Sequence, residues 1–440
     1  MTDLIERDVP VAAEGEAGDA VMAARRVFPG WTRTPAGERA SALRAAAVEL
    51  RERAGELAEL NNRETGKLVE DGVGGVLAGA GTLEQYAELG PVHRGRTLRG
   101  DWGATDLMVP EPRGVVVALT PWNDPVAVAC GLLGAALATG NVVIHKPSER
   151  CPRTGQALTG ILARHLPPGV LRWVPGDGRT GTKLAAHPDV DVVAHVGSTA
   201  TGRSIAVATA RTGAKALLEN GGNDPLIVDA GVDPRWAAGQ AAQGAFANAG
   251  QICVSVERIY VHRDLAPEFL AALTGEARKR PDEVPMPPLV DRRQRDQVHE
   301  HVVDALDKGA ELLTGGEVPD EGPFYPATVL TGCTPWMRVM REETFGPVAP
   351  VRVVEDFDQA LREACDDRYG LAATVLTDSM EHAQRAWREL PVGTVKVNAV
   401  FGGAPGGAAQ PRKASGDGFG YGPELLDEMT RMKIVHLNAR

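Results

Sequence analysis

The stretch that decides the fold is GVVVALTPWNDPVAVACGLLGAALATGNVVIHKPSE, residues 114–149. It contains two short apolar runs, 115–119 and 141–146, on either side of an apolar segment with the composition of a buried helix. A strand reaches a parallel neighbour only through a crossover of about a dozen residues or more, and this segment is long enough. The stretch therefore predicts a strand, a helix and a second strand of one parallel sheet.

The same alternation continues beyond this unit. Further apolar runs follow at intervals of about 20 to 30 residues, as repeated strand–helix units produce: 171–174, 191–196 and 215–220. We therefore expect a parallel sheet of the type that binds nucleotides. Ahead of it, the Ala-, Glu-, Arg- and Leu-rich residues 19–60 predict surface helices.

A second α/β domain is expected after residue 221. Its predicted strands are 225–231, 257–262, 346–354 and 370–377, and its predicted helices are 235–247 and 295–313. Residues 401–423 are rich in glycine, proline and alanine, which predicts a long irregular crossing. Residues 431–437 predict a terminal strand.

Composition excludes several classes of protein. The 440 residues exceed what one hydrophobic core usually supports, and their 43% hydrophobic content can fill two or three domains. The formal net charge of −11 argues against nucleic acid and anionic membranes as partners. No apolar stretch approaches the ~20 residues of a membrane span and the start is too polar for a secretory signal, so we expect a soluble, cytoplasmic protein. The five scattered cysteines predict neither disulfides nor a zinc site.

Residues 176–181, GDGRTG, have the spacing of a dinucleotide fingerprint, but a lone match is weak. The fingerprint also needs an acidic residue about 20 positions further on to hold the ribose, and His195 and Val196 stand there. Residues 197–202, GSTATG, form a better phosphate cradle, because backbone N–H groups and the helix dipole converge where a helix opens after a strand. A plain helix cap is the alternative for that stretch.

Six motifs at consistent spacing resemble those of the aldehyde dehydrogenase superfamily. They are PWNDP (121–125), NVVIHKPSE (141–149), GSTATG (197–202), LENGG (218–222), GQIC (250–253) and EETFGPV (342–348). The resemblance covers the chain from about Ala17 to its C-terminus and implies an α/β, aldehyde dehydrogenase-like fold. Its expected parts are a Rossmann-like NAD-binding domain (1–93 and 113–221), an α/β catalytic domain (222–414), a small oligomerisation element (94–112 and 430–440) and a returning segment (415–429).

The resemblance implies NAD(P)-dependent oxidation of an aldehyde to a carboxylic acid. Cys253 matches the nucleophile, which adds to the carbonyl carbon so that the resulting alkoxide can release hydride. The Asn123 amide and the Cys253 backbone N–H match the donors that stabilise this alkoxide. Glu219 matches the general base that activates water for hydrolysis of the thioester. Lys146 is also expected to be one of the catalytic residues. Outside the family context, Cys253 would be interpreted as a buried structural thiol.

The resemblance also assigns a cofactor site. Lys146 and Glu149 match the pair that grips the adenosine ribose, and Glu343 matches the ligand of the nicotinamide ribose. A carboxylate at position 149 would accept both ribose hydroxyls and repel a 2′-phosphate, which favours NAD over NADP without excluding NADP. The full expected set is Thr120, Pro121, Trp122, Lys146, Ser148, Glu149, Gly178, Gly197, Ser198, Thr201, Asn220, Gly221, Glu343 and Phe345.

The expected substrate pocket departs from the family pattern. Asp124 replaces an aromatic residue after Asn123, and Ala247 stands where aromatic residues often line the tunnel. We therefore expect a wide, polar pocket in which Asp124 favours small polar or amino-bearing aldehydes. The alternative is that Asp124 caps the helix that follows it. The other expected pocket residues are Val128, Ile252 and Val254.

Further departures concern turnover, partners and metals. Asn220, Val196 and Gly420 replace a leucine, a threonine and a glutamate of the family, so a non-catalytic or weakly active binding protein of this fold is an alternative function. An acyl reductase is another alternative function, and the presence of Glu219 argues against it.

The resemblance implies a homodimer or homotetramer. No metal is expected, because the histidines of HEH (299–301) are spaced i and i+2 on a helix, and we interpret them as surface residues.

Overall fold

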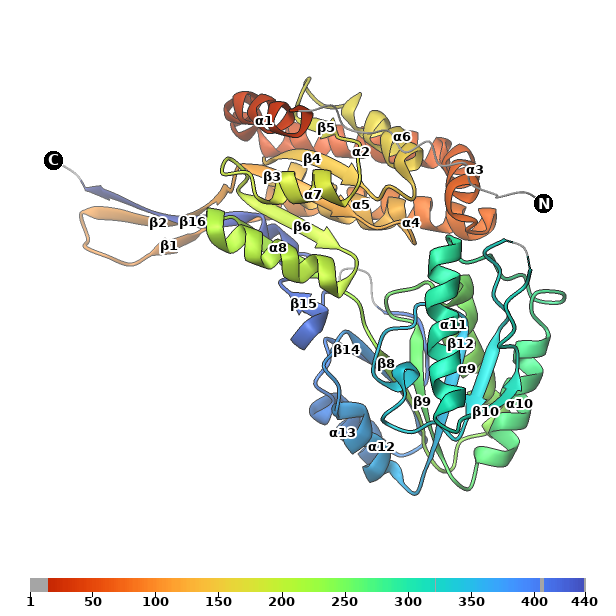
Figure 1. Ribbon diagram of the computed structural model, residues 1–440. Helices are drawn as coiled ribbons and strands as arrows, with labels where there is room; N and C mark the ends of the chain where they lie inside the picture. Colours follow the sequence, from red (N-terminus) through yellow and green to blue (C-terminus); the bar gives the residue numbers. More distant parts are fainter. Residues whose placement is uncertain (1–14, 321, 404–406, 439–440) are drawn as a thin grey trace.

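The computed structural model describes residues 15–320, 322–403 and 407–438. Their strands form three sheets, of six, seven and three strands. In Figure 1 the six-stranded sheet and its helices form the upper lobe, the seven-stranded sheet belongs to the lower lobe, and the three-stranded sheet extends to one side. The chain passes from the upper lobe to the lower one between residues 219 and 224 and returns between 397 and 416.

The six-stranded sheet has the order β15-β7-β6-β3-β4-β5, and all neighbours are parallel except β15. Its strands are β3 (Val115–Thr120), β4 (Val142–Pro147), β5 (Leu171–Trp173), β6 (Val192–Val196), β7 (Lys215–Glu219) and β15 (Gly416–Asp417). The helices of this lobe are α1 (Glu16–Arg33), α2 (Ala36–Glu52), α3 (Ala54–Thr65), α4 (Val69–Leu89), α5 (Pro125–Ala138), α6 (Pro152–Ala163), α7 (Gly178–Ala185) and α8 (Thr199–Thr212). The parallel strands and the N-terminal helices expected from the sequence are confirmed.

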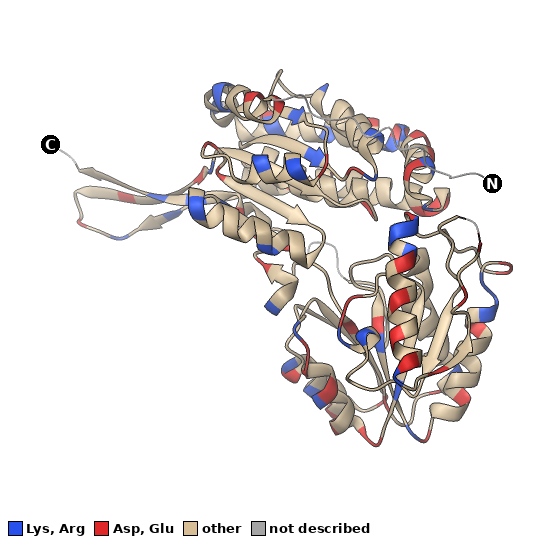
Figure 2. Ribbon diagram, in the orientation of Figure 1, with Lys and Arg blue, Asp and Glu red and all other residues tan. Residues whose placement is uncertain are grey.

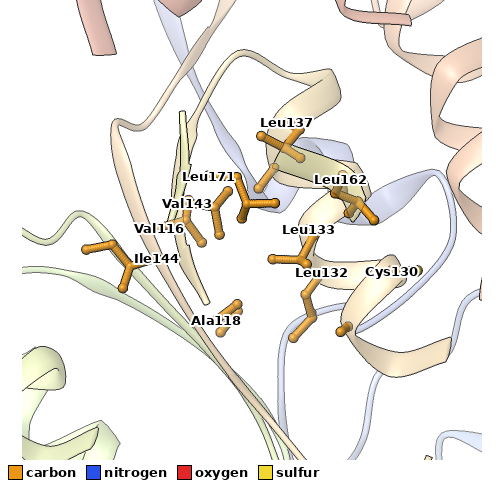
Figure 3. Close-up of a cluster of buried hydrophobic side chains, with 14 of the residues drawn as sticks. Val116, Ala118, Cys130, Leu132, Leu133, Leu137, Val143, Ile144, Leu162 and Leu171 are labelled. Atoms are coloured by element: carbon orange, nitrogen blue, oxygen red, sulfur yellow. The ribbon is translucent and has the colours of Figure 1, made fainter. Parts of the chain in front are cut away.

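Residues 114–149 lie in the core of this lobe. Every residue of β3 and β4 is buried, and α5 packs on both strands. Figure 3 shows Val143 of β4 in one apolar cluster with Leu133 and Leu137 of α5. Continuous burial along a strand is typical of a parallel sheet that helices cover on both faces.

The seven-stranded sheet has the order β10-β11-β12-β9-β8-β13-β14, and only the edge strand β10 is antiparallel to its neighbour. Its strands are β8 (Asp224–Val228), β9 (Val256–His262), β10 (Glu311–Thr314), β11 (Thr328–Thr331), β12 (Val348–Val354), β13 (Ala372–Leu376) and β14 (Thr394–Val397). The helices of this lobe are α9 (Pro234–Phe246), α10 (Ala266–Arg278), α11 (Arg292–Asp307), α12 (Phe357–Cys365) and α13 (Met380–Glu389). The four strands expected here are confirmed, with shifted ends.

Two predictions for this lobe are wrong. The helix expected over 295–313 ends at Asp307, because Gly309 adopts a φ of 94° and the chain turns back as β10. His301 is not a surface residue: it is 1% exposed, and its Nδ1 lies 3.1 Å from the Thr344 hydroxyl. The i, i+2 spacing leaves His299 on another side of α11, beside Tyr325. Within the described ranges, no group of His, Cys, Asp or Glu could hold a metal ion.

The three-stranded sheet is antiparallel, in the order β1-β2-β16. Its strands are β1 (Arg96–Leu98), β2 (Ala104–Pro112) and β16 (Thr430–Asn438), the last of which confirms the expected terminal strand. The short helices of the chain are η1 (Gly90–Val92), η2 (Ala247–Gly250), η3 (Arg338–Met340), η4 (Lys413–Ser415) and α14 (Glu424–Glu428). The expected crossing, 401–423, is irregular apart from η4 and β15, and its residues 404–406 lie outside the described ones. No helix of the described residues is long and apolar enough to cross a membrane.

Candidate active site

Cys253 lies in the short loop between η2 and β9, after a sharp turn. Residues 248–250 have φ values between 49° and 72°, in the left-handed region that ends a helical segment. The turn brings the loop to a cavity of about 200 Å³, which Cys253 lines together with Asn123, Glu343 and Phe345. Cys253 as a residue is partly exposed, unlike the fully buried Cys130.

Asn123 follows β3 and is held from two sides. Its Nδ2 donates a hydrogen bond of 3.1 Å to the backbone carbonyl of Gln251, two residues before Cys253. Lys67 Nζ donates to the backbone carbonyl of Asn123 at 3.2 Å. An amide nitrogen carries two N–H groups, so one of them remains for a ligand in the cavity.

Glu219 is the last residue of β7. It does not line either cavity of the site, but its charge acts on the Cys253 thiol. Gly420 lies directly against it, and a side chain at that position would overlap Glu219 Oε2. Burial raises the pKa of Glu219 above its ordinary value, which brings this carboxylate closer to the range of a general base near neutral pH.

The surroundings of Cys253 are acidic. Burial raises the pKa of its thiol, and the negative charges of four acids raise it further: Glu219, Asp224, Glu343 and Asp124. The protonated thiol is therefore favoured in the protein alone, and a positively charged ligand beside it would promote the thiolate.

Glu343 reaches the same cavity from the loop before β12. Its Oε1 accepts a hydrogen bond of 3.1 Å from the Gly222 backbone N–H. A side chain at Gly221 would overlap the Glu343 carboxylate, so only glycine allows this approach. Burial raises the pKa of Glu343 to about 7.

Glu257 of β9 holds the Glu343 loop, and our motif search missed it. It is buried, and its carboxylate accepts hydrogen bonds of 3.0 Å from the backbone N–H groups of Thr344 and Phe345. Burial, followed by the charge of Glu343, raises the pKa of Glu257 to about 8. The signal in the sequence was a carboxylate within the strand run 256–262, where burial of a charge requires dedicated partners.

A larger cavity of about 310 Å³ lies at the carboxyl ends of β3, β4 and β6. Ten of the expected cofactor residues line it: Thr120, Pro121, Trp122, Lys146, Ser148, Glu149, Gly178, Gly197, Ser198 and Thr201. The other four line the cavity of Cys253: Asn220, Gly221, Glu343 and Phe345. Lys146 lies in the larger cavity alone, where its Nζ donates to the carbonyls of Pro147 and Gly176 at 2.8 Å each, so the structure does not bring it to Cys253.

Ser198 has the geometry of a helix cap and also lines the larger cavity. Its Oγ accepts a hydrogen bond of 3.3 Å from the Thr201 backbone N–H, as the cap alternative predicted. A single cap satisfies one of the four unpaired N–H groups of a helix N-terminus. Other donors of the first turn of α8 therefore remain for a ligand.

The two cavities adjoin, because both are lined by the same seven residues: Pro121, Trp122, Arg150, Val196, Gly197, Ser198 and Arg293. The Arg150 guanidinium lies 5.2 Å from the centre of the Trp122 ring, and the Trp122 and Phe345 rings are nearly perpendicular, with their centres 5.7 Å apart. An elongated ligand could therefore extend from Glu149 to Cys253.

Known proteins resemble this chain over nearly its whole length. The model of the aldehyde dehydrogenase family matches residues 3–435. Aminoaldehyde dehydrogenase 2, peroxisomal, of Pisum sativum is 35% identical over 458 residues, which cover 99% of this chain and 90% of that protein. The chain belongs to the aldehyde dehydrogenase family. Members of this family oxidise aldehydes with NAD or NADP.

Solved aldehyde dehydrogenases share the fold of this one. A 3,6-anhydro-L-galactose dehydrogenase in complex with NAP has a TM-score of 0.93 and 33% identity, over 97% of this chain and 92% of that one. Betaine aldehyde dehydrogenase of Staphylococcus aureus in complex with NAD+ has a TM-score of 0.93 and 31% identity, over 97% and 88% of the two chains. The α/β, aldehyde dehydrogenase-like fold is thus confirmed, whereas the residue ranges of its domains stay a prediction.

Asp124 of this aldehyde dehydrogenase precedes α5 but does not cap it. Its side chain makes no cap hydrogen bond, so the capping alternative is wrong. Instead Asp124 Oδ1 forms an ion pair of 3.3 Å with Lys67, the same ammonium that holds Asn123. The remaining expected pocket residues are partly buried and line neither cavity, so their role stays a prediction: Val128, Ala247, Ile252 and Val254.

Three residues of α11 were missed by the sequence reasoning. Arg293 lines both cavities, and Gln294 and Gln297 line the cavity of Cys253. No motif marks them, because they reach the site only through the packing of the lower lobe against the upper one.

Proposed function

We propose that this aldehyde dehydrogenase oxidises a small or polar aldehyde to a free carboxylic acid, with NAD as the favoured cofactor. The observation that carries this proposal is the cavity that Cys253 shares with Asn123 and Glu343, which adjoins the cavity of Lys146 and Glu149. A nucleophile, an amide donor and space for a dinucleotide are the parts that this reaction requires.

The residues around the two cavities fit a dinucleotide. Lys146 and Glu149 would hold the adenosine ribose, the first turn of α8 the diphosphate, and Glu343 the nicotinamide ribose. The close approach of Gly221 to Glu343 supports this fit, because it leaves the carboxylate at the cavity surface. An oxidised nicotinamide ring, when bound, accepts hydride and brings a positive charge close to the thiol.

In the proposed reaction the Cys253 thiolate forms a C–S bond to the carbonyl carbon, and the π electron pair of the carbonyl moves to its oxygen. Asn123 Nδ2 and the Cys253 backbone N–H would donate to this oxygen, each donor lowering the barrier by ~3 kcal/mol. Once hydride has left, a thioester remains on the sulfur. Glu219 would then take a proton from water, whose oxygen attacks the thioester carbon and releases the thiolate.

Glu149 supports NAD as the favoured dinucleotide, because a carboxylate beside the adenosine ribose repels a 2′-phosphate. For the substrate, the pair of Asp124 and Lys67 next to Asn123 supports a polar aldehyde. An amino-bearing aldehyde would compete with Lys67 for the Asp124 carboxylate, which favours neutral polar aldehydes over cationic ones. The family assignment does not favour the alternative of a non-catalytic binding protein.

The proposal is tested by mixing the protein with NAD, or with NADP, and a panel of short polar and alkyl aldehydes while following the absorbance of the reduced cofactor. We expect absorbance to rise with polar aldehydes, faster with NAD, and the rise to vanish in Cys253→Ala. Cys365→Ala is the matched control, since this thiol lines neither cavity, and should leave the rate unchanged. A Cys253→Ala variant as active as the wild type, or cofactor binding without turnover of any aldehyde, would contradict the proposal.

A further inference from the structure

We propose that Arg293 of α11 binds the diphosphate of the cofactor from the lower lobe, so that the bound dinucleotide joins the two lobes. The inference rests on the dinucleotide site of the proposed function, and it assigns to that site a residue outside all six motifs.

The position of Arg293 along the site indicates which part of the ligand it meets. Lys146 and Glu149 line only the larger cavity, whereas Cys253 and Glu343 line only the smaller one. Arg293 lines both, in company with Ser198. A dinucleotide with adenosine at one end and nicotinamide at the other would therefore pass Arg293 with its middle, which is the diphosphate.

The start of α11 is rich in arginine. Arg292, Arg293 and Arg295 occupy the first turn, where the helix dipole is positive. The acidic residues beside them are the N-cap Asp291 and Asp296, which pairs with Arg295. Figure 2 shows this basic end of α11 directed at the upper lobe. An anion bound at this end of α11 would be attracted both by the Arg293 charge and by the positive end of the helix dipole.

The guanidinium of Arg293 is available for such an anion. Within the described part of the chain it has no ion-pair or hydrogen-bond partner, whereas Arg295 bonds Asp296 and the Gly322 carbonyl. A guanidinium donates two parallel hydrogen bonds to phosphate oxygens, which an ammonium cannot do.

The opposite wall of the junction offers complementary donors. Ser198 and the first turn of α8 present backbone N–H groups at the positive end of a helix of 14 residues. His195 lines the larger cavity next to Ser198 and is 7% exposed. Burial lowers the pKa of His195 to about 4, so the ring is neutral at pH 7 and one nitrogen can donate. Arg150, paired with Asp291 at 2.9 Å, adds a second guanidinium to the junction.

Calorimetric titration of the full-length protein tests the role of Arg293, with NAD, ADP and adenosine as ligands. In Arg293→Gln we expect the Kd of NAD and of ADP to rise about tenfold, and the Kd of adenosine, which lacks phosphate, to stay unchanged. Added salt should weaken NAD binding less in this variant than in the wild type. Arg293→Lys should recover part of the affinity, because it keeps the charge but loses the fork of donors.

Arg292→Gln is the matched control, since it removes the same charge one residue away and lines neither cavity. It should leave the three Kd values unchanged within about twofold, because Arg292 does not line the proposed site. Unchanged NAD affinity in Arg293→Gln, an equal loss in Arg292→Gln, or an equal loss for adenosine would each overturn the proposal. Failure of the wild type to bind NAD or NADP would instead refute the proposed function on which it rests.

Discussion

Cys253, Glu219 and Asn123 come from three separate motifs, and each is placed by a different local feature. The left-handed turn at 248–250 places Cys253, the end of β7 places Glu219, and hydrogen bonds from two sides hold Asn123. Because Glu219 acts on Cys253 only through its charge and lines neither cavity, its proposed role is the transfer of a proton through water. Loss of such a role would slow the hydrolysis of the thioester and leave the earlier release of hydride intact.

Glu219→Gln is therefore expected to separate the two halves of the reaction. The first turnover should still release reduced NAD as a burst, since Cys253 and Asn123 remain, whereas steady turnover should fall on the order of 100-fold or more without the base. Rapid-mixing absorbance measures both phases. Loss of the burst together with the steady rate would contradict this assignment.

The pH dependence of the steady rate has a defined sign. Glu219 must be deprotonated to accept a proton, and burial raises its pKa, so the rate should increase with pH through a midpoint above the ordinary value of a glutamate. This increase of the steady rate with pH should be absent in Glu219→Gln. The same midpoint in both proteins would show that another group controls the increase.

At the scale of elements, the nucleophile loop and the Glu343 loop are locked together. Gly250 of η2 has a φ of 72°, and a side chain there would overlap the backbone carbonyl of Gly346. Glu257 of β9 holds the same loop through two backbone N–H groups. The relative position of Cys253 and Glu343 therefore depends on contacts between backbone segments, which cannot adapt as flexible side chains do.

Gly250→Ala is expected to destabilise the protein by more than ~2 kcal/mol, because an alanine in the left-handed region is strained and the added carbon meets backbone. Chemical denaturation followed by circular dichroism measures the free energy of unfolding. Gly239→Ala in α9 is the control: its added carbon meets open space, and it should stabilise the helix by roughly 0.5–1 kcal/mol. Equal stability of the two variants would contradict the locking of the two loops.

At the scale of the whole molecule, the three-stranded sheet leaves apolar side chains uncovered. It extends away from both lobes in Figure 1. Ile434 is 69% exposed and Met432 is 45% exposed, and their partners in β2, Met108 and Pro110, share that face. Exposed apolar patches of this kind mark interaction surfaces, and we propose that a second copy of the chain covers this one in a homodimer or homotetramer.

Ile434→Asp is expected to shift the protein from the oligomer to the monomer, because it places a charge in the proposed interface. Sedimentation velocity measures the change in mass. Thr97→Asp in β1 adds the same charge to the other face of the sheet and should leave the mass unchanged. A monomeric wild type, or an Ile434→Asp variant of unchanged mass, would contradict the proposal.

The sequence by itself determined the apolar strands β3 to β9, β12 and β13, the parallel direction of those in the upper lobe, and the motif residues that could carry the chemistry. These features are local: an apolar run such as 115–119 contains its own period, and a motif such as GQIC carries its nucleophile within four residues. For the same reason the expected cofactor residues could be named before their cavities were known.

Only the tertiary structure decided which side chains meet across distant parts of the chain. Asp124 pairs with Lys67 instead of capping its own helix, His301 is buried against Thr344, and Arg293 reaches a cavity that the other lobe builds. None of these contacts joins residues that are close in sequence. Local propensity describes one element at a time, whereas the partner of a charged or polar side chain depends on which elements pack against it, and only the folded chain sets that.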